Sequence, residues 1–159
     1  MFIRVQNNKV KTETNKKKIK ILLIDDDETM SIYFRDVFWI HGKGDIYNVA
    51  TVPSIEEAEK IIENKNERPD TIFLDILMSS KGKKLGDKAY QMSHSLDFIN
   101  KIKKNKDLAD INIIIYSGQR EKYLKQILEG IDVDGYLIKG ETMPREIVAF
   151  ADKIHGTNN

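Results

Sequence analysis

The sequence contains no cysteine, and this absence excludes disulfide bonds, thiolate catalysis and zinc sites built on thiolates. The few histidines, His41, His94 and His155, are scattered without the spacing of metal ligands, so we do not expect a histidine metal site. The chain opens without an apolar core of signal-peptide length, and no later run approaches the roughly 18 apolar residues that cross a bilayer. We therefore expect a cytoplasmic protein that makes no membrane contact.

Length and charge distribution limit the organisation of the chain. With 159 residues, 40% of them hydrophobic, it has the size of one domain with a proper core. Residues 1–18 contain six basic residues and one acid, a charge of +5 against −4 for residues 19–159. A short terminus rich in lysine and asparagine is typical of a solvated leader. We expect a disordered leader at 1–18, a short tail at 156–159 and no nucleic-acid partner.

Apolar runs of strand length alternate with segments of helical period along the rest of the chain. This alternation is the pattern of an α/β fold with a parallel sheet. The predicted strands are residues 19–24, 46–51, 71–75, 111–116 and 135–138. The residues expected on the buried helix faces are Met30, Tyr33, Phe34, Val37, Phe38, Ile55, Ala58, Ile61, Ile62, Leu96, Phe98, Ile99, Ile102, Tyr123, Leu124, Ile127, Leu128, Ile147, Val148, Ala151 and Ile154.

Local signals predict where several of these helices begin and end. Ser54 with Glu57 three residues later predicts a helix start. Pro144 and Gly156 predict the first residue and the end of the last helix. The third connection is abnormal, because residues 79–94 intervene before the next amphipathic stretch and most connections are far shorter. We expect an inserted, lysine-rich loop there, which screens a neighbouring site from water, selects a partner, or has no role.

Polar residues stand at the ends of four predicted strands. Asp25 and Asp26 follow the first strand, Asp75 ends the third, and Ser117 and Lys139 follow the fourth and fifth. Each one alone has an ordinary explanation as a helix cap or a solvated side chain. Because the carboxyl ends of parallel strands meet at one edge of a sheet, we expect the whole set to converge. Clustered carboxylates repel one another unless a hard divalent cation neutralises them.

This set of side chains suits the handling of a phosphoryl group, whose oxygens require positive charge and hydrogen-bond donors. An acidic pair, an aspartate, a serine and a lysine in this order over five strand–helix units resemble the receiver domain of two-component response regulators. The resemblance covers residues 19–155. It implies the flavodoxin-like fold, a (βα)5 three-layer sandwich whose parallel strands have the order 2-1-3-4-5.

The resemblance also implies roles for the acidic residues. The segment LLIDDD is similar to the family's acidic pair, so Asp25 and Asp26 would hold Mg²⁺, with Asp26 the more direct ligand and Asp27 the cap of the first helix. The segment PDTIFLDILM resembles the family's phosphorylation motif. It makes Asp75 the phosphoacceptor and a metal ligand, and it offers the backbone carbonyl of Leu77 to the metal.

Two later segments complete the resemblance. In IIIYSG, Ser117 stands where the family has threonine or serine, and GYLIKG supplies the active-site Lys139, with Tyr136 at the aromatic switch position. The implied partners are a sensor histidine kinase or phosphotransfer protein, which donates the phosphoryl group, and a downstream protein target that the sequence does not identify. Two positions depart from the family pattern, since Ser79 and Gly140 replace its usual prolines.

Two other interpretations remain open at this stage. In residues 25–29, Asp25, Asp27 and Thr29 match the DxDxT motif of haloacid-dehalogenase phosphohydrolases. This interpretation would make Asp25 the nucleophile and Asp27 the acid/base, and it would leave Asp75 without a role. No acidic pair ends a strand after Lys139, and the chain lacks length for the usual cap domain. The other alternative is a receiver-shaped module that binds partners without phosphorylation. Under the favoured interpretation the chain is a signalling switch and not an enzyme, and a homodimer through its fourth and fifth units is conceivable.

Overall fold

The computed structural model describes residues 16–78 and 88–157, and these residues form a parallel sheet flanked by helices. The strands lie in the order β2-β1-β3-β4-β5 and all pair in parallel. Their bounds are Ile19–Ile24 for β1, Tyr47–Val52 for β2, Thr71–Leu74 for β3, Asn112–Ser117 for β4 and Gly135–Ile138 for β5. The predicted flavodoxin-like fold and strand order are therefore confirmed.

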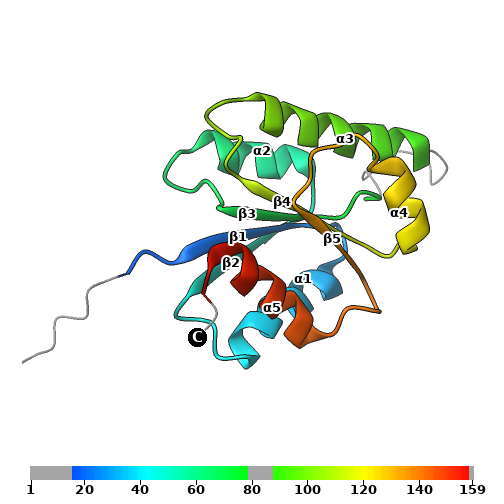
Figure 1. The fold of residues 1–159 in the computed structure, drawn as a ribbon. Helices are drawn as coiled ribbons and strands as arrows, with labels where there is room; N and C mark the ends of the chain where they lie inside the picture. The colour runs from blue at the N-terminus through cyan, green and yellow to red at the C-terminus, as the bar shows by residue number, and fades with distance from the viewer. Residues whose placement is uncertain (1–15, 79–87, 158–159) are drawn as a thin grey trace, which may run out of the picture.

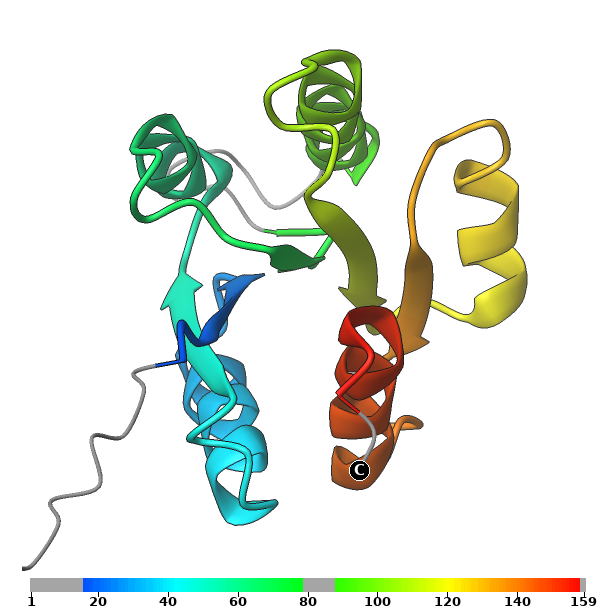
Figure 2. The same cartoon turned by 60° about the vertical axis from the view of Figure 1, so that its left-hand side comes forward.

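Helices cover both faces of the sheet and bury it between them (Figures 1 and 2). Their bounds are Glu28–Ile40 for α1, Ile55–Glu63 for α2, Lys88–Lys104 for α3, Glu121–Ile127 for α4 and Pro144–His155 for α5. One apolar cluster joins α2, α3 and α4 to the sheet, and the second joins α1 and α5 to its other face. Within the described residues no helix is both long and apolar enough to span a membrane.

Backbone hydrogen bonds extend the pairing of the strands by one residue at their carboxyl ends. Asp25 N donates to Val52 O, Asp75 N donates to Ile24 O, and Lys139 N donates to Ser117 O, at 2.9 to 3.0 Å. The residues that follow β1, β3 and β5 are thus fixed in direction by the sheet itself. This register delivers their side chains to the same edge of the molecule.

The helix caps predicted from the sequence are present. Asp27 Oδ1 accepts a hydrogen bond from Met30 N at 3.1 Å, and Ser54 Oγ accepts one from Glu57 N at 3.2 Å. Pro144 opens α5, and Gly156 ends it with a φ of 64° in the left-handed region. Glycine reaches that region at little cost because it has no Cβ. Short polar residues and glycine therefore set these helix ends as the sequence indicated.

Some predicted boundaries are wrong by one residue or more. The second and fourth strands start and end one residue later than 46–51 and 111–116, so Ser117 is the last residue of β4 instead of its successor. The third ends at Leu74, one residue before Asp75. Tyr33 and Tyr123, predicted on buried faces, are 36% and 39% exposed. The amphipathic phenol lets a tyrosine lie at the border of an apolar stripe with its hydroxyl in water.

The predicted loop at 79–94 is too long, because residues 88–94 belong to α3. Residues 79–87 lie outside the described part of the chain, as do residues 1–15 of the predicted leader and residues 158–159. The first turns of α3 lack an apolar stripe, so the spacing of hydrophobic residues does not indicate a helix there. No glycine or proline interrupts Lys88–Lys104. Ser95 then anchors the helix, donating from Oγ to the carbonyl of Ile76 at 3.1 Å.

A buried aspartate, Asp152, ties the C-terminal end of α5 to the first residue of β2. Asp152 Oδ2 lies 2.9 Å from Lys43 Nζ, and its Oδ1 accepts hydrogen bonds from Tyr47 and Thr157, each at 2.7 Å. Burial acts to raise the pKa of Asp152, but the hydrogen bonds from Lys43, Thr157 and Tyr47 hold it below its ordinary value. The folded protein therefore favours the ionised carboxylate.

Replacing this carboxylate should weaken the fold in a pH-dependent way. Asp152→Asn is expected to lower the free energy of unfolding by about 2 kcal/mol at neutral pH, because hydrogen bonds to a charged group are lost. A lowered pKa means that the unfolded chain takes up the proton first, so this contribution should fade as the pH falls below about 5. Urea unfolding at several pH values measures both effects. The exposed Asp36→Asn serves as control, and an equal loss there would contradict the assignment.

Candidate functional site

Three carboxylates converge at the carboxyl edge of the central strands. Asp25 and Asp26 follow β1, and Asp75 follows β3, the neighbouring strand. One carboxylate oxygen from each lies within 4.8 Å of the others. Asp25 is buried, Asp75 is 8% exposed as a residue, and Asp26 is partly exposed. The sheet therefore concentrates negative charge at a place that is only partly open to solvent.

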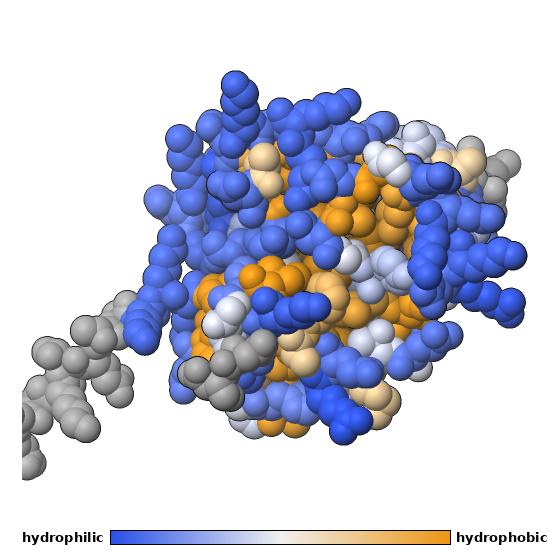
Figure 3. Space-filling view, viewed as in Figure 1, coloured by the Kyte–Doolittle hydropathy of each residue, from blue (hydrophilic) through white to orange (hydrophobic). Residues whose placement is uncertain are grey.

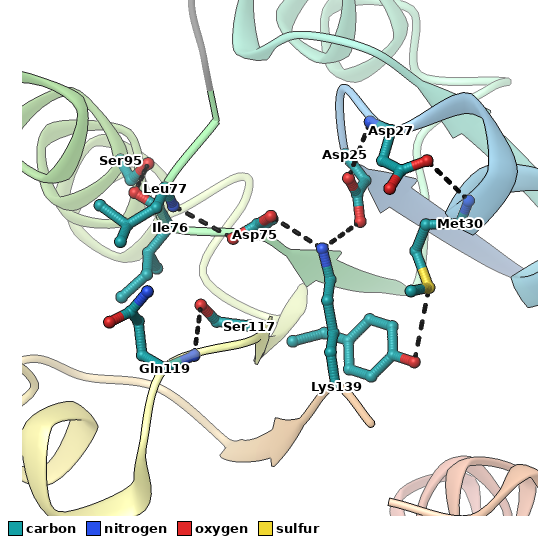
Figure 4. A network of polar contacts seen from close by, with 11 residues as sticks. Asp25, Asp27, Met30, Asp75, Ile76, Leu77, Ser95, Ser117, Gln119 and Lys139 are labelled. Carbon is teal, nitrogen blue, oxygen red and sulfur yellow. Dashed lines mark hydrogen bonds and ion pairs between the residues drawn. The ribbon is translucent and has the colours of Figure 1, made fainter. Parts of the chain in front are cut away.

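Lys139 places a positive charge between two of these carboxylates (Figure 4). Its Nζ lies 2.5 Å from Asp25 Oδ2 and 2.8 Å from Asp75 Oδ2. The lysine side chain is 14% exposed, so the ammonium group is mostly shielded from water. Gly140 follows with a φ of +82°, a conformation that glycine adopts at little cost and that proline cannot adopt. Lys139 thus stands between the end of β5 and a glycine turn.

Burial and the neighbouring charges act in opposite directions on the ionisation of this pair. Burial raises the pKa of Asp25, and the hydrogen bonds from Lys139 and Asp27 N only partly offset it. Burial acts to lower the pKa of Lys139, but Asp75 and Asp25 raise it above its ordinary value. The lysine therefore remains an ammonium group at neutral pH. The ionised form of Asp25 would be favoured by a further positive charge.

Asp75 is held at both oxygens. Its Oδ1 accepts a hydrogen bond from the backbone N of Leu77 at 3.1 Å, and its Oδ2 accepts one from Lys139 Nζ at 2.8 Å (Figure 4). These contacts orient the carboxylate while its side chain stays 12% exposed. The role predicted for the Leu77 carbonyl as a metal ligand stays a prediction, since the hydrogen bond from Leu77 to Asp75 uses the backbone amide.

Ser117 and Tyr136 make their hydrogen bonds to residues outside the charged cluster. Ser117 is buried at the end of β4, and its Oγ accepts a hydrogen bond from Gln119 N at 3.4 Å. Tyr136, on β5, donates its hydroxyl to Glu121 Oε1 of α4 at 3.0 Å. The Tyr136 hydroxyl is therefore bound to α4 and not to the aspartate cluster. The structure brings Asp25, Asp26, Asp75 and Lys139 together, and it directs Tyr136 elsewhere.

The sequence interpretation overlooked Tyr116, which the structure places beside Lys139. The lysine Nζ lies 5.7 Å from the centroid of the Tyr116 ring. Tyr116 is 1% exposed, and its hydroxyl donates to Met30 Sδ at 3.7 Å. In the sequence this tyrosine is one apolar residue in a strand of isoleucines. Its position directly before Ser117, at the functional end of a strand, was the available signal.

The donor set fits a magnesium ion. Carboxylate oxygens are the ligands that this hard cation prefers. Asp25 Oδ2 is fully buried, and Lys139 Nζ pairs with it at 2.5 Å. Three carboxylates that share one ammonium group still carry excess negative charge, and this is costly at a mostly buried site unless a further cation neutralises it. The acidic cluster and this oxygen together are what a divalent cation would neutralise.

The phosphohydrolase interpretation finds no support in the same geometry. Its proposed acid/base, Asp27, is exposed and uses its Oδ1 to cap α1. Asp75, which that interpretation leaves without a role, shares Lys139 with Asp25. The arrangement therefore centres on residues of β1, β3 and β5 together and not on the DxDxT segment alone.

Comparison with known proteins gives a family and a fold. The family model described as the response regulator receiver domain matches residues 21–151. No curated protein matches the chain.

Three similar solved structures illustrate the likeness in fold. A phosphorylated cyanobacterial phytochrome response regulator is 18% identical at a TM-score of 0.66, over 90% of this chain and 98% of that one. The receiver domain of a sensor histidine kinase from Pseudomonas aeruginosa, with magnesium coordinated in its active-site cleft, is 16% identical at 0.66, over 88% and 99%. The chemotaxis response regulator CheY4 of Vibrio cholerae is 16% identical at 0.65, over 87% and 99%.

Proposed function

This chain belongs to the family of response regulator receiver domains, and from that membership we propose that it accepts a phosphoryl group on Asp75. The proposed donor is the phosphohistidine of a sensor histidine kinase or phosphotransfer protein in the cytoplasm. The proposed receiver unit is residues 19–155, preceded by a basic leader at 1–18. Phosphorylation would change which downstream protein the domain binds. A single observation carries the proposal: one ammonium group, Lys139 Nζ, contacts both Asp75 and the buried Asp25.

The proposed transfer leaves little covalent chemistry to the protein. A carboxylate oxygen of Asp75 attacks phosphorus, a P–O bond forms as the P–N bond to histidine breaks, and the histidine nitrogen leaves with that electron pair. The product is an acyl phosphate on Asp75. Catalysis then consists of positioning and of charge stabilisation. The Leu77 amide and Lys139 already hold the two oxygens of the Asp75 carboxylate in place.

The other residues of the cluster supply charge and hydrogen bonds. Lys139 would move from the carboxylate to an oxygen of the transferred group, where a point charge suits phosphate. Asp25, Asp26, Asp75 and the Leu77 carbonyl would hold Mg²⁺. When bound, this ion would neutralise negative charge on the carboxylates and on the phosphoryl oxygens. Ser117 Oγ would donate a hydrogen bond to the phosphoryl group once it is attached.

Intact-mass measurement after treatment with acetyl phosphate tests the proposal. With Mg²⁺, we expect the mass of one phosphoryl group to be added to each chain, and with EDTA we expect none. Hydroxylamine treatment should then remove the adduct, because it cleaves an acyl phosphate and leaves a phosphoserine intact. A chain that gains no phosphoryl group at any Mg²⁺ concentration would overturn the proposal. That outcome would favour a receiver-shaped module that binds partners without phosphorylation.

We further propose that the switch runs through Ser117 and Tyr136. The hydroxyl of Tyr136 is bound to Glu121, which also pairs with Lys125 at 2.7 Å. If phosphorylation draws Ser117 toward Asp75, Tyr136 can leave Glu121 and turn inward, as a population shift between two packings. All four residues of β5 are only partly buried. On the face of the molecule that carries α4, β5 and α5, apolar side chains show between polar ones (Figure 3).

Removing the serine hydroxyl should separate phosphorylation from switching. Ser117→Ala is expected to retain the phosphoryl adduct on Asp75 but to lose the change at Tyr136, because the hydroxyl that connects them is gone. The environment of Tyr136 can be followed by ¹⁹F NMR after incorporation of 3-fluorotyrosine, with exposed Tyr123 as an internal reference. Ser117→Thr keeps the hydroxyl and should keep the change. A full response in Ser117→Ala would show that Tyr136 is coupled in another way.

A further inference from the structure

We propose that Tyr116 is a positioning residue for the phosphoryl transfer, and that its ring face holds the Lys139 ammonium group at the site. This inference rests on the proposed function and adds to it a residue with no charge and no hydrogen bond to Asp75. It gives the Lys139 ammonium group three partners, two carboxylates and an aromatic ring.

The ring of Tyr116 is itself fixed by its surroundings. Tyr116 pairs with Leu137 in the register of β4 and β5, and it belongs to the apolar cluster under α1 and α5. Its ring centroid lies 5.7 Å from that of Phe34 and 6.4 Å from that of Phe73, to which it stands at 89°. Its hydroxyl donates to Met30 Sδ at 3.7 Å. The ring is therefore a rigid wall of the site.

The distance between the ring and the lysine is that of a cation–π contact. Nζ of Lys139 lies 5.7 Å from the ring centroid, within the roughly 6 Å over which the ring quadrupole attracts a cation. Such contacts strengthen when the cation is removed from water, and the lysine side chain is only 14% exposed. Lysine otherwise has considerable rotamer freedom. The ring restricts that freedom without neutralising the charge.

The ring differs from the two carboxylate partners of Lys139 in one respect that matters for the reaction. Asp75 becomes an acyl phosphate in the proposed transfer, and Asp25 would share its charge with Mg²⁺. Both carboxylates therefore attract the ammonium group less at the moment when it must meet the phosphoryl oxygens. The face of Tyr116 has the same character before and after transfer. It is the contact that can stay with the Lys139 ammonium group as it moves from the Asp75 carboxylate to a phosphoryl oxygen.

A pair of substitutions separates this role from simple packing. Tyr116→Leu removes the ring and is expected to slow labelling of Asp75 by acetyl phosphate with saturating Mg²⁺ by about tenfold, the order expected for one shielded cation–π contact. Tyr116→Phe retains the π face and should restore a rate close to that of the unmodified chain. Phe38→Leu is the matched control, because Phe38 is 1% exposed in the same cluster but belongs to the α1 helix.

The inference about Tyr116 is supported if Tyr116→Leu is labelled slowly while Tyr116→Phe and Phe38→Leu are labelled at nearly the rate of the unmodified chain. It is overturned if Tyr116→Leu labels normally, or if Phe38→Leu slows labelling by the same factor, since the effect would then follow from weakened packing. Far-ultraviolet circular dichroism at the assay temperature confirms that each variant is folded.

A second measurement is independent of phosphorylation. In the protein without Mg²⁺, the side-chain methylene protons of Lys139 should show ring-current shifts in the NMR spectrum. These shifts should persist in Tyr116→Phe and vanish in Tyr116→Leu, and their absence from the unmodified chain would overturn the placement of the lysine on the ring. If the unmodified chain shows the shifts but is never labelled, the proposed function fails and the inferred contact stands. If it is labelled but shows no shifts, the proposed function stands and the inferred contact fails.

Discussion

Asparagine in place of Asp75 is expected to abolish the covalent phosphorylation of the chain by acetyl phosphate with Mg²⁺. The substitution removes the attacking carboxylate and preserves the size of the side chain. The amide can still accept the hydrogen bond that the Leu77 amide donates at 3.1 Å, so the loop should keep its conformation. Loss of the adduct would therefore report loss of the nucleophile rather than collapse of the site. Intact mass and peptide mapping of the modified residue measure this outcome.

Matched changes in the acidic segment distinguish this result from the phosphohydrolase interpretation. Asp27→Asn alters an exposed helix cap, and it should leave labelling of Asp75 intact. Asp25→Asn should slow labelling, because a buried carboxylate of the cluster is lost, while the phosphoryl group still appears on Asp75. A phosphohydrolase that uses Asp25 as its nucleophile would lose its covalent intermediate with Asp25→Asn and keep it with Asp75→Asn. That second pattern would contradict the receiver assignment.

Removal of the Lys139 ammonium group should have the largest effect on stability. Lys139→Met keeps most of the apolar stem but leaves Asp25, whose side chain is fully buried, beside Asp75 without a cation. Loss of one partner from a buried ion pair costs about 3 kcal/mol. We expect a decrease of this size in the free energy of unfolding without Mg²⁺. Chemical denaturation with urea measures it.

Magnesium should reverse part of that loss. A ligand that binds only the folded protein stabilises it according to its concentration and affinity, and the repulsion in the variant makes a cation more favourable there. The increase in stability with Mg²⁺ should therefore be larger in Lys139→Met than in the unmodified chain. Lys125→Met is the control, since its ion pair with Glu121 is 62% and 55% exposed, and it should change neither quantity measurably. Equal Mg²⁺ responses in both variants would argue against a cation among these carboxylates.

Much of the fold could be predicted from the sequence because the sheet is covered on both faces. Strands such as Ile19–Ile24 and Thr71–Leu74 are then nearly continuous apolar runs, and the polar residue that follows each one marks its end. Parallel pairing brings those ends together, so the convergence of Asp25, Asp75 and Lys139 followed from strand order alone. The start of α3 at Lys88 could not be seen in this way, since its first turns show no apolar stripe.

The contacts between side chains of the site depended on packing that no sequence pattern expresses. The sequence placed Lys139 at the correct edge, but it did not show that this lysine would contact Asp25 as closely as Asp75. Only its place directly before Ser117 distinguished Tyr116 from a core residue, because its position against Lys139 depends on the aromatic side chains under α1. Strand patterns encode which way a residue faces, and only the packed structure shows which group it meets there.

The network around Asp152 has a mechanical consequence for the proposed switch. Lys43, Tyr47 and Thr157 hold the C-terminal end of α5, whereas its other end begins at Pro144, a few residues after Lys139. If phosphorylation displaces the segment that joins them, we expect the helix to tilt about its anchored end. A small displacement beside Asp75 would then become a wider sweep at Pro144, with the far terminus of the helix acting as the pivot.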